Sequence, residues 1–312
     1  MEGALELLCP DCRAPLAATE RGHRCPRGHA WPTRRGIPRF VPGEGYARNF
    51  GFEWRRYKKT QLDRFGSRAS EREFVEKTRL RPEDVRGKRI LDVGVGTGRY
   101  ADIIRRWGGE VYGVDLSMAV ETARKNLPGC FVAQADLFKL PFREASFDVV
   151  YSIGVLHHTP DTLAAVKAIL PYVKPGGTFA IWVYRKDIWT HYCDIYRRFT
   201  PDMPQSLLHF LSNLSIPYYH FLEAVRLIPG IGELARDRLL WYLFMPMHKD
   251  PFWRVLDTYD WYSPRYQWKH TPEEVEGWFR ALGLEAVERQ PLWQTAVRGR
   301  VPVRVAAPVA VS

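Results

Sequence analysis

The 312-residue sequence predicts an α/β fold with a parallel central sheet. Three observations lead to this expectation. Short β-branched runs alternate with helical patterns at regular spacing through the middle of the chain. A glycine-rich turn directly follows the first of these runs, and acids stand at the ends of successive predicted strands. Open α/β sheets bind ligands at such turns and strand ends.

Five strands are expected, at residues 88–93, 110–115, 130–135, 147–153 and 178–184. The helix after the first strand repeats apolar residues at i, i+3, i+4 and i+7, from Tyr100 to Trp107, which is typical of one buried helix face. Glycines 108 and 109 end this helix, and Ser117 can cap the next one. The helix before the fifth strand should stop at residues 174–177, which read Lys-Pro-Gly-Gly. The pattern is therefore a series of βαβ units.

The turn at residues 94–98 reads Gly-Val-Gly-Thr-Gly, unlike the Gly-x-Gly-x-x-Gly of dinucleotide folds, and Asp92 precedes it. Asp115 ends the second strand, where it can accept hydrogen bonds from ribose hydroxyls, as an NAD enzyme would also require. Asp136 follows the third strand and can accept a hydrogen bond from an adenine amino group. Any one of these acids alone could be a solvated loop carboxylate, but three at successive strand ends indicate a nucleoside site.

Five motifs in order resemble the class I S-adenosylmethionine (SAM)-dependent methyltransferases: residues 90–98, 114–115, 135–136, 147–152 and 174–177. The resemblance covers roughly residues 88–184, with a weaker continuation at 271–285. It implies that the three glycines of the turn border the methionine part of SAM and that residues 152–155 line the methyl face. The cofactor-binding residues implied in this way are Asp92, Gly94, Gly96, Gly98, Asp115, Leu116, Asp136, Leu137, Ser152 and Gly154.

Displacement at a sulfonium methyl group needs mainly orientation, and a base only where the acceptor has a proton to lose. His157 and His158 follow the fourth strand, and an imidazole has a suitable pKa for such a catalytic base. Either histidine could instead only hydrogen-bond the loop. Cysteine-dependent methylation of a nucleobase is not expected, because Cys130 lies inside a strand and Cys193 lies outside the core. The stretch 152–161 resembles the type-11 branch of the family, which includes many small-molecule and quinone methyltransferases.

The N-terminal cysteines follow the spacing C-x2-C-x12-C-x3-H, formed by Cys9, Cys12, Cys25 and His29. Two such knuckles can complete a tetrahedral zinc site. With all four ligands from the protein, the site would be structural and would stabilise a module too small to bury its own core. His23 could replace His29, and an unmetallated N-terminus is the alternative.

This N-terminal module also resembles the zinc ribbons of an rRNA guanine-N1 methyltransferase, of the activator protein of tRNA methyltransferases and of other bacterial methyltransferases. In the RNA enzymes the ribbon contacts RNA. Residues 1–89 hold 21 basic against 12 acidic side chains, a net charge of +9, which would suit phosphate binding. A solvated arginine-rich surface is the alternative. Seven arginines crowd the module: Arg13, Arg21, Arg24, Arg27, Arg34, Arg35 and Arg39.

Two further segments flank the predicted cofactor domain. Residues 46–65 mix aromatic and basic side chains and could form a lid, an RNA-facing strip or an amphipathic helix. Residues 185–270 contain 18 aromatic residues among 86 and carry 11 basic against 9 acidic side chains. We expect a mostly helical cap there, with many rings forming its core. Its apolar character beside the methyl group suggests an acceptor with apolar or sugar-like faces.

The expected organisation is a zinc ribbon (1–45), a basic aromatic linker or lid (46–87), a SAM-binding core (88–184), a helical substrate cap (185–270) and the last helix and strands (271–312). With 46% hydrophobic and 26% charged residues, the composition is that of a globular protein,. We find no sequence run long enough to cross a membrane and expect a cytoplasmic location.

The function expected from the sequence is methyl transfer from SAM to a small-molecule or glycan- or lipid-linked acceptor. An RNA base methyltransferase and a non-catalytic scaffold are the alternatives. Loss of SAM binding would favour the scaffold.

Overall fold

The computed structural model describes residues 5–47, 50–51, 63, 68–186, 191–290 and 295–303. Its centre is a seven-stranded sheet with the order β10-β11-β9-β8-β5-β6-β7. β11 (Thr295–Arg300) pairs antiparallel with β9, and β10 (Glu285–Arg289) pairs antiparallel with β11. The predicted α/β fold is confirmed, with two antiparallel strands added at one edge. The parallel strands are β5 (Arg89–Val93), β6 (Glu110–Asp115), β7 (Phe131–Gln134), β8 (Phe147–Ile153) and β9 (Val173–Val183).

The boundary between the fourth helical pattern and the last parallel strand differs from the prediction. Helix α6 (Thr162–Ile169) continues into the 3-10 turn η4 (Leu170–Tyr172), and β9 then begins at Val173. Residues 174–177 therefore lie within the strand instead of ending the helix. Gly177 packs closely against the neighbouring strand, since a Cβ there would lie 2.8 Å from the carbonyl oxygen of Asp148. The glycine thus permits a close strand approach, which its sequence alone does not distinguish from a helix stop.

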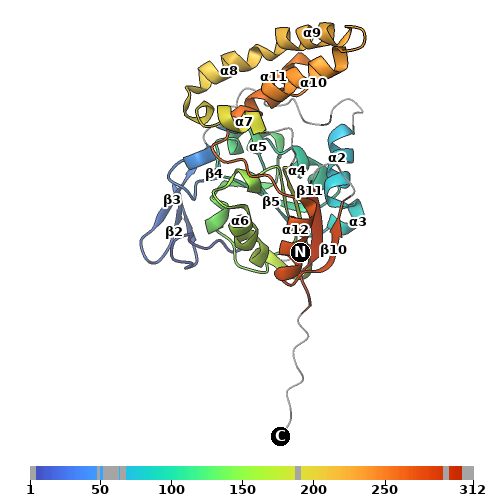
Figure 1. Ribbon diagram of the computed structural model, residues 1–312. Coiled ribbons are helices and arrows are strands. Elements are labelled where there is room, and N and C mark those ends of the chain that lie inside the picture. The colour runs from blue at the N-terminus through green and yellow to red at the C-terminus, as the bar shows by residue number, and fades with distance from the viewer. Residues whose placement is uncertain are drawn as a thin grey trace.

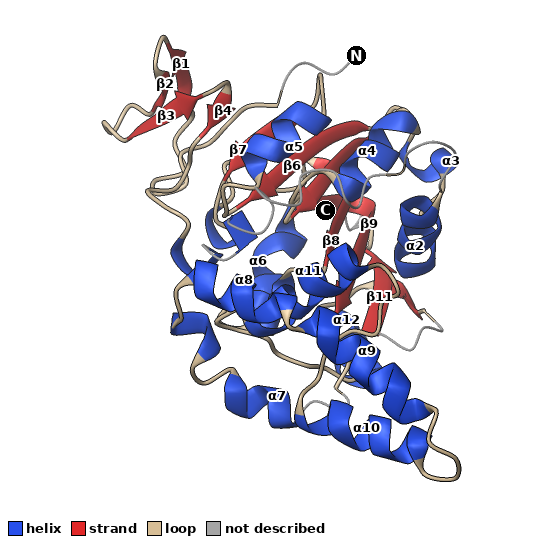
Figure 2. Ribbon diagram, turned by 90° about the horizontal axis from the view of Figure 1, so that it is seen from above, coloured by secondary structure: helices blue, strands red, loops and turns tan. Residues whose placement is uncertain are grey.

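Helices cover both faces of the sheet (Figure 2). One face carries α2 (Ala69–Thr78), α3 (Pro82–Val85), α4 (Arg99–Arg106) and α5 (Val120–Asn126), which bury Phe74, Ile104 and Ala123 in one hydrophobic cluster. The other face carries α6 and α12 (Pro272–Ala281), which bury Val166 and Phe279 in a second cluster. A doubly covered sheet explains why its parallel strands read as continuous apolar runs.

The N-terminal module is a small antiparallel sheet of four strands: β1 (Ala17–Thr19), β2 (Gly22–Arg24), β3 (Ala30–Arg34) and β4 (Ile37–Pro38). It lies beside β7, the edge strand of the large sheet (Figures 1 and 2). The backbone N–H of Phe40 donates to the carbonyl of Gln134 at 2.7 Å, and Arg39 forms a parallel bridge with Gln134. Leu8 donates to the carbonyl of Pro141 at 2.9 Å. These backbone contacts dock the module against the β7 edge, while its four strands form a sheet of their own.

A helical layer stands above the sheet in Figure 1. It contains α7 (His191–Tyr196), α8 (Gln205–Asn213), α9 (Ser215–Arg226), α10 (Gly232–Tyr242) and α11 (Pro251–Tyr262). Its small interior is formed by Cys193, Leu208, Tyr259 and Tyr262. Most of the exposed large apolar side chains among the described residues belong to this layer. Residues 191–262 thus supply the helices expected for the cap.

Of the predicted linker, residues 48–49, 52–62 and 64–67 lie outside the described residues. Its first described part is the 3-10 turn η1 (Gly45–Ala47), and its second half forms α2 and α3. No helix within the described ranges is both long and apolar enough to cross a bilayer.

Candidate active site and metal site

The glycine-rich turn connects the end of β5 to the start of α4. Gly94 has a φ of +86°, and a Cβ at this position would lie 2.2 Å from Cγ2 of Val155. Gly98 has a φ of +89° and forms the N-cap of α4, where a Cβ would lie 2.8 Å from the side chain of Leu127. Both positions therefore require glycine, because a side chain would meet strain and a clash. The turn brings bare backbone to the carboxyl edge of the sheet.

Asp115 holds this turn against the next strand. Its Oδ2 accepts a hydrogen bond from the backbone N–H of Gly96 at 2.9 Å. Its Oδ1 accepts from both the backbone N–H and the hydroxyl of Ser117, at 2.8 and 2.7 Å. Burial raises the pKa of Asp115, and these three donors oppose the shift. The carboxylate is thus fixed at the end of β6, where each oxygen can still accept a further hydrogen bond.

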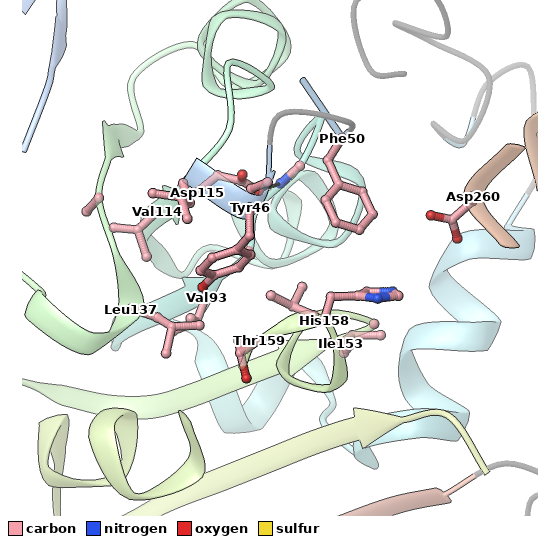
Figure 3. Close-up of a pocket in the computed structure, with 17 residues that line it drawn as sticks. Tyr46, Phe50, Val93, Val114, Asp115, Leu137, Ile153, His158, Thr159 and Asp260 are labelled. Carbon is pink, nitrogen blue, oxygen red and sulfur yellow. Dashed lines mark hydrogen bonds between the residues drawn. The ribbon is translucent and has the colours of Figure 1, made fainter. Parts of the chain in front are cut away.

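A hollow opens at this edge of the sheet (Figure 3). Its cavity volume is about 150 Å³, which is below the roughly 300–1,000 Å³ typical of small-molecule sites. Of the predicted site residues, seven line it: Gly94, Gly96, Asp115, Leu116, Leu137, Gly154 and His158. Tyr46, Ala47 and Phe50 from the predicted lid also line it, as do Thr159 and Asp260, which the sequence did not indicate.

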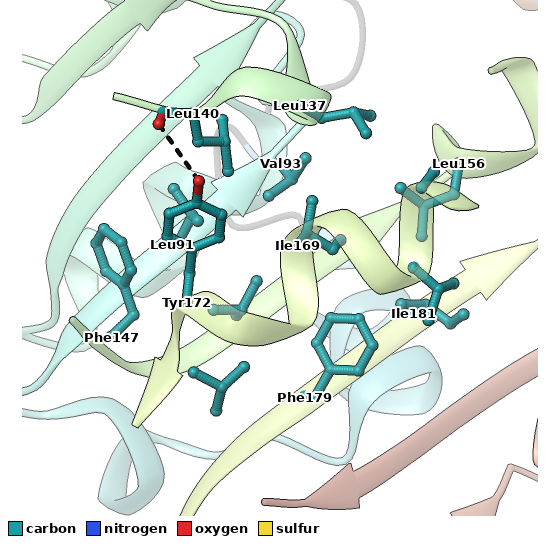
Figure 4. Packing of buried hydrophobic residues seen from close by; sticks show 14 of the residues in the cluster. Leu91, Val93, Leu137, Leu140, Phe147, Leu156, Ile169, Tyr172, Phe179 and Ile181 are labelled. Carbon is teal, nitrogen blue, oxygen red and sulfur yellow. Dashed lines mark hydrogen bonds between the residues drawn. The ribbon is translucent and has the colours of Figure 1, made fainter. Parts of the chain in front are cut away.

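The floor of the hollow is continuous with the hydrophobic core. Val93 and Leu137 line the hollow and also pack among the buried residues of the α6 face, where Leu156 and Ile169 lie close by (Figure 4). Residues anchored in a close-packed core have little freedom to move, so this floor is rigid. The site is therefore preformed on its sheet side.

Five predicted site residues are not among those lining the hollow: Asp92, Gly98, Asp136, Ser152 and His157. Asp92 is buried beneath the turn, where it accepts a hydrogen bond from the Tyr151 hydroxyl at 2.7 Å, and burial raises its pKa to about 7. The hydroxyl of Ser152 donates to the carbonyl of Val93 at 2.8 Å and ties β8 to β5. Both residues support the turn from below.

Asp136 forms the start of the 3-10 turn η2 (Leu137–Lys139), where its Oδ1 accepts from the N–H of Phe138 at 3.0 Å. The negative charge of Asp136 acts on Tyr46, a residue that lines the hollow. Burial is the main cause of the raised pKa of Tyr46, and Asp136 and Asp115 raise it further. The Tyr46 side chain therefore lies near the two acids that we expected to bind a nucleoside.

The two histidines differ in position. His157 is fully buried, its ring stacks on Tyr184 at 4.0 Å, and neither ring nitrogen has a hydrogen-bond partner within the described residues. His158 lines the hollow and its Nδ1 lies 2.8 Å from the carbonyl oxygen of Tyr266. Burial lowers the pKa of His157 well below its ordinary value and that of His158 to about 3. The lowered pKa values make both imidazoles weaker bases than an ordinary histidine, and their catalytic role stays a prediction.

Asp260, on α11, faces the hollow from the helical layer (Figure 3). Its Oδ2 accepts a hydrogen bond from the Tyr184 hydroxyl at 3.1 Å. Burial, followed by the negative charge of Asp257 one turn earlier, raises the pKa of Asp260 to about 7. The one sequence signal that could have indicated this site is a pair of acids three residues apart in an aromatic segment.

The N-terminal cluster gathers the four expected metal ligands. The ligand atoms of Cys9, Cys12, Cys25 and His29 all lie within 4.8 Å of one another. Nδ1 of His29 is 3.4 Å from Sγ of both Cys9 and Cys25, and Sγ of Cys12 is 3.6 Å from that of Cys25. Ligands of a tetrahedral zinc ion would be about 3.6–3.8 Å apart. His23 lies outside the cluster, with its ring near Phe40. Of the two histidines considered as the fourth ligand, His29 is therefore the one in position.

Several arginines of the N-terminal module contact the large domain. Arg13 donates to the carbonyls of Leu140 and Phe142, at 2.7 and 2.5 Å. Arg35 and Arg39 both pair with Glu121, at 2.7 and 3.1 Å. These three cations therefore help to dock the module. Arg21, Arg24, Arg27 and Arg34 are exposed.

Residues 91–181 match the family model described as a methyltransferase domain. The chain is 27% identical over 149 residues to a demethylmenaquinone methyltransferase of Streptomyces avermitilis, covering 47% of this chain and 64% of that protein. It is 36% identical over 102 residues to a probable tRNA methyltransferase 9B of Bos taurus, covering 31% of this chain and 22% of that protein. The chain thus spans less than two thirds of the length of both relatives.

Among solved structures, a SAM-dependent methyltransferase from Mesorhizobium loti is similar, with 31% identity, a TM-score of 0.34, and coverage of 38% of this chain and 54% of that one.

Proposed function

We propose, from the premise that residues 91–181 are a class I SAM-dependent methyltransferase domain, that the whole chain transfers a methyl group from SAM to a small-molecule or glycan- or lipid-linked acceptor. One observation supports this most strongly. A single hollow joins the glycine turn and Asp115 to the underside of the helical cap. Cofactor and acceptor could therefore meet in one enclosed place.

The residues of the hollow fit SAM. Gly94, Gly96 and Gly154 line it without side chains, so a ligand can approach the backbone closely,. We infer that Asp115 binds the ribose hydroxyls through its remaining lone pairs and that Asp136 binds the adenine amino group. Bound SAM would supply a methyl group on a positively charged sulfur. The chain itself would orient the two reactants and keep water out.

Two features support a small or lipid-like acceptor over RNA. The cap over the hollow is aromatic and its charges are nearly balanced, so it offers little attraction to a phosphate backbone. Three of the seven arginines of the N-terminal module are used to dock that module. The four exposed arginines favour the second candidate, an RNA methyltransferase whose ribbon contacts RNA, and one relative is named as a probable tRNA methyltransferase.

We further propose that Cys9, Cys12, Cys25 and His29 hold a structural zinc ion. The four protein ligands complete a tetrahedron and leave no open coordination position for catalysis. The cytoplasmic location stays a prediction.

The test is to incubate the protein with methyl-labelled SAM and a cell extract separated into RNA, protein, lipid-glycan and small-molecule fractions. Label in the small-molecule or lipid-glycan fraction would support the proposal, and label in RNA would support the second candidate. The Asp115→Ala variant is the control, because at a SAM concentration near the wild-type dissociation constant it should transfer far less label to every fraction. A wild-type protein that neither binds SAM nor transfers label would leave the scaffold interpretation.

A further inference from the structure

Asp260 is supplied by the helical cap, but it faces the hollow that the sheet forms. Asp115 and Asp260 are the two carboxylates lining this hollow among the described residues, and they come from opposite sides of it. Figure 3 shows Asp260 directed toward the space next to Phe50 and His158. Asp115 accepts three hydrogen bonds from its own chain, whereas the only hydrogen bond found for Asp260 within the described ranges is the one from Tyr184. The carboxylate of Asp260 thus has lone pairs left to accept hydrogen bonds from a ligand in the hollow.

Its surroundings fix the carboxylate in place. Tyr184 donates to Oδ2 from the end of β9, and the Tyr184 ring is held between His157 at 4.0 Å and Trp261 at 5.6 Å, stacked on both. The Tyr184 hydroxyl can therefore move little. Asp260 itself is on α11, whose first turn is capped by Asp250 through the N–H groups of residues 252 and 253. A carboxylate held by a helix and an immobilised phenol has the fixed geometry that proton transfer requires.

We propose, building on the proposed function, that Asp260 is the general base of this methyltransferase and that it takes the proton of a phenolic hydroxyl on the acceptor. The acceptor O–H bond breaks as an O–H bond forms on the carboxylate of Asp260. The electron pair left on the acceptor oxygen forms the new bond to the methyl carbon, whose bond to sulfur breaks with its pair going to sulfur. The products are a methyl ether, a neutral thioether and a protonated Asp260.

The class of acceptor follows from the rings around this carboxylate. Phe50 and His158 line the hollow with their ring centroids 5.0 Å apart, and Tyr46 lines it from the same segment as Phe50. Flat aromatic surfaces bind flat aromatic ligands by stacked or edge contacts. A phenol, catechol or quinol would stack there and present its hydroxyl to Asp260. The cap residue would then decide both which acceptor binds and which of its atoms is methylated.

The acid-base properties of the site agree with this role. A phenol ionises near pH 10, and a carboxylate with a pKa of about 7 is a far better partner for its proton than an ordinary aspartate,. The groups facing Asp260 are Asp257 on its own helix, Tyr184 directly after β9 and Arg197 after α7, with His158 across the hollow. Asp257 raises the pKa of Asp260 and is itself paired with His248 at 2.9 Å, while Tyr184 and Arg197 lower it.

The experiment compares the full-length protein with its Asp260→Asn variant, using catechol and a hydroquinone as acceptor probes and methyl-labelled SAM. Label transfer by Asp260→Asn should fall at least about 100-fold, with the dissociation constant for SAM unchanged by calorimetry. The matched control is Asp202→Asn, the same substitution at an exposed cap residue whose partner is Arg265. This control should transfer label at the wild-type rate.

A readout independent of activity is the titration of the Asp260 carboxyl carbon by ¹³C NMR in the protein without ligand. We expect a pKa near 7, which Asp257→Asn should lower because it removes a like charge. In a plot of the wild-type methyl-transfer rate against pH, the rise on the acid side should have its midpoint at this pKa. In Asp257→Asn this midpoint should move to lower pH together with the pKa of Asp260. An ordinary aspartate pKa, or full activity of Asp260→Asn, would overturn the inference alone. Intact SAM binding without label on either probe would overturn the phenolic acceptor, and absent SAM binding would overturn the proposed function itself.

Discussion

Asp115→Ala tests the centre of the site, because this one carboxylate holds the glycine turn and is proposed to bind the cofactor as well. The substitution removes acceptors for three hydrogen bonds of 2.7–2.9 Å, from Gly96 and from both donors of Ser117. Each such bond contributes about 1 kcal/mol net. The free energy of unfolding in urea should therefore fall by about 3 kcal/mol. The fold should persist, since this loss is smaller than the stability of a typical domain.

SAM binding should fall further than stability. Loss of two charge-assisted hydrogen bonds to ribose hydroxyls, at about 1.5 kcal/mol each, raises the dissociation constant about 100-fold. The matched control is Asp148→Ala. Asp148 accepts from the N–H of Arg89 at 2.9 Å and from Lys174 at 3.1 Å, near the start of β8 and so at the opposite end of the strand from the hollow. The Asp148→Ala protein should also be destabilised, but it should bind SAM with the wild-type dissociation constant. A folded Asp115→Ala protein that binds SAM as wild type does would refute the site assignment.

Three further outcomes are expected. Cys12→Ser should lose its bound zinc by elemental analysis and melt at a lower temperature, because a structural metal ion contributes folding free energy; retained zinc would contradict the cluster. Gly94→Ala should unfold at lower urea concentration, by at least about 1 kcal/mol, and bind SAM more weakly, since the new Cβ would meet Val155. The pKa of Asp92 is raised to about 7 when folded but is about 3.9 when unfolded, so the folded protein retains a proton that the unfolded chain releases. Asp92 should therefore lower the free energy of unfolding by up to about 4 kcal/mol between pH 4 and pH 7, and the fall measured in urea titrations should be smaller by this amount in Asp92→Asn.

The sequence predicted the parts of the site that depend on local order along the chain. The turn from Gly94 to Gly98 and the acid at Asp115 could be located because each directly follows a strand whose pattern is clear. The Cys9–His29 cluster could be located because metal ligands have characteristic spacing. Spacing alone could not choose between His23 and His29, since the two imidazoles differ only in where the strands place them.

The missed features depend on packing between distant segments. Asp260 reaches the hollow only because the cap folds back over the sheet, and no local pattern encodes that contact. The low pKa of His158 has the same origin, since it results from burial of the hollow beneath residues far along the chain. The arginines of the ribbon illustrate a further limit. Their number suggested an RNA surface, whereas Arg13 and Arg39 are used within the protein.

If the N-terminal module holds the proposed zinc ion, its docking onto β7 makes the solubility of the protein depend on metal supply. β7 is the edge of the large sheet, and Phe40 satisfies a carbonyl of this strand, at Gln134. If the module unfolds without its ion, as small zinc modules do, the strand is left open to pairing with other chains. Chelation would then produce self-association and precipitation before the methyltransferase domain melts. On this proposal, a cell short of zinc would lose the protein through aggregation and proteolysis, although a structural metal ion would take no part in the chemistry.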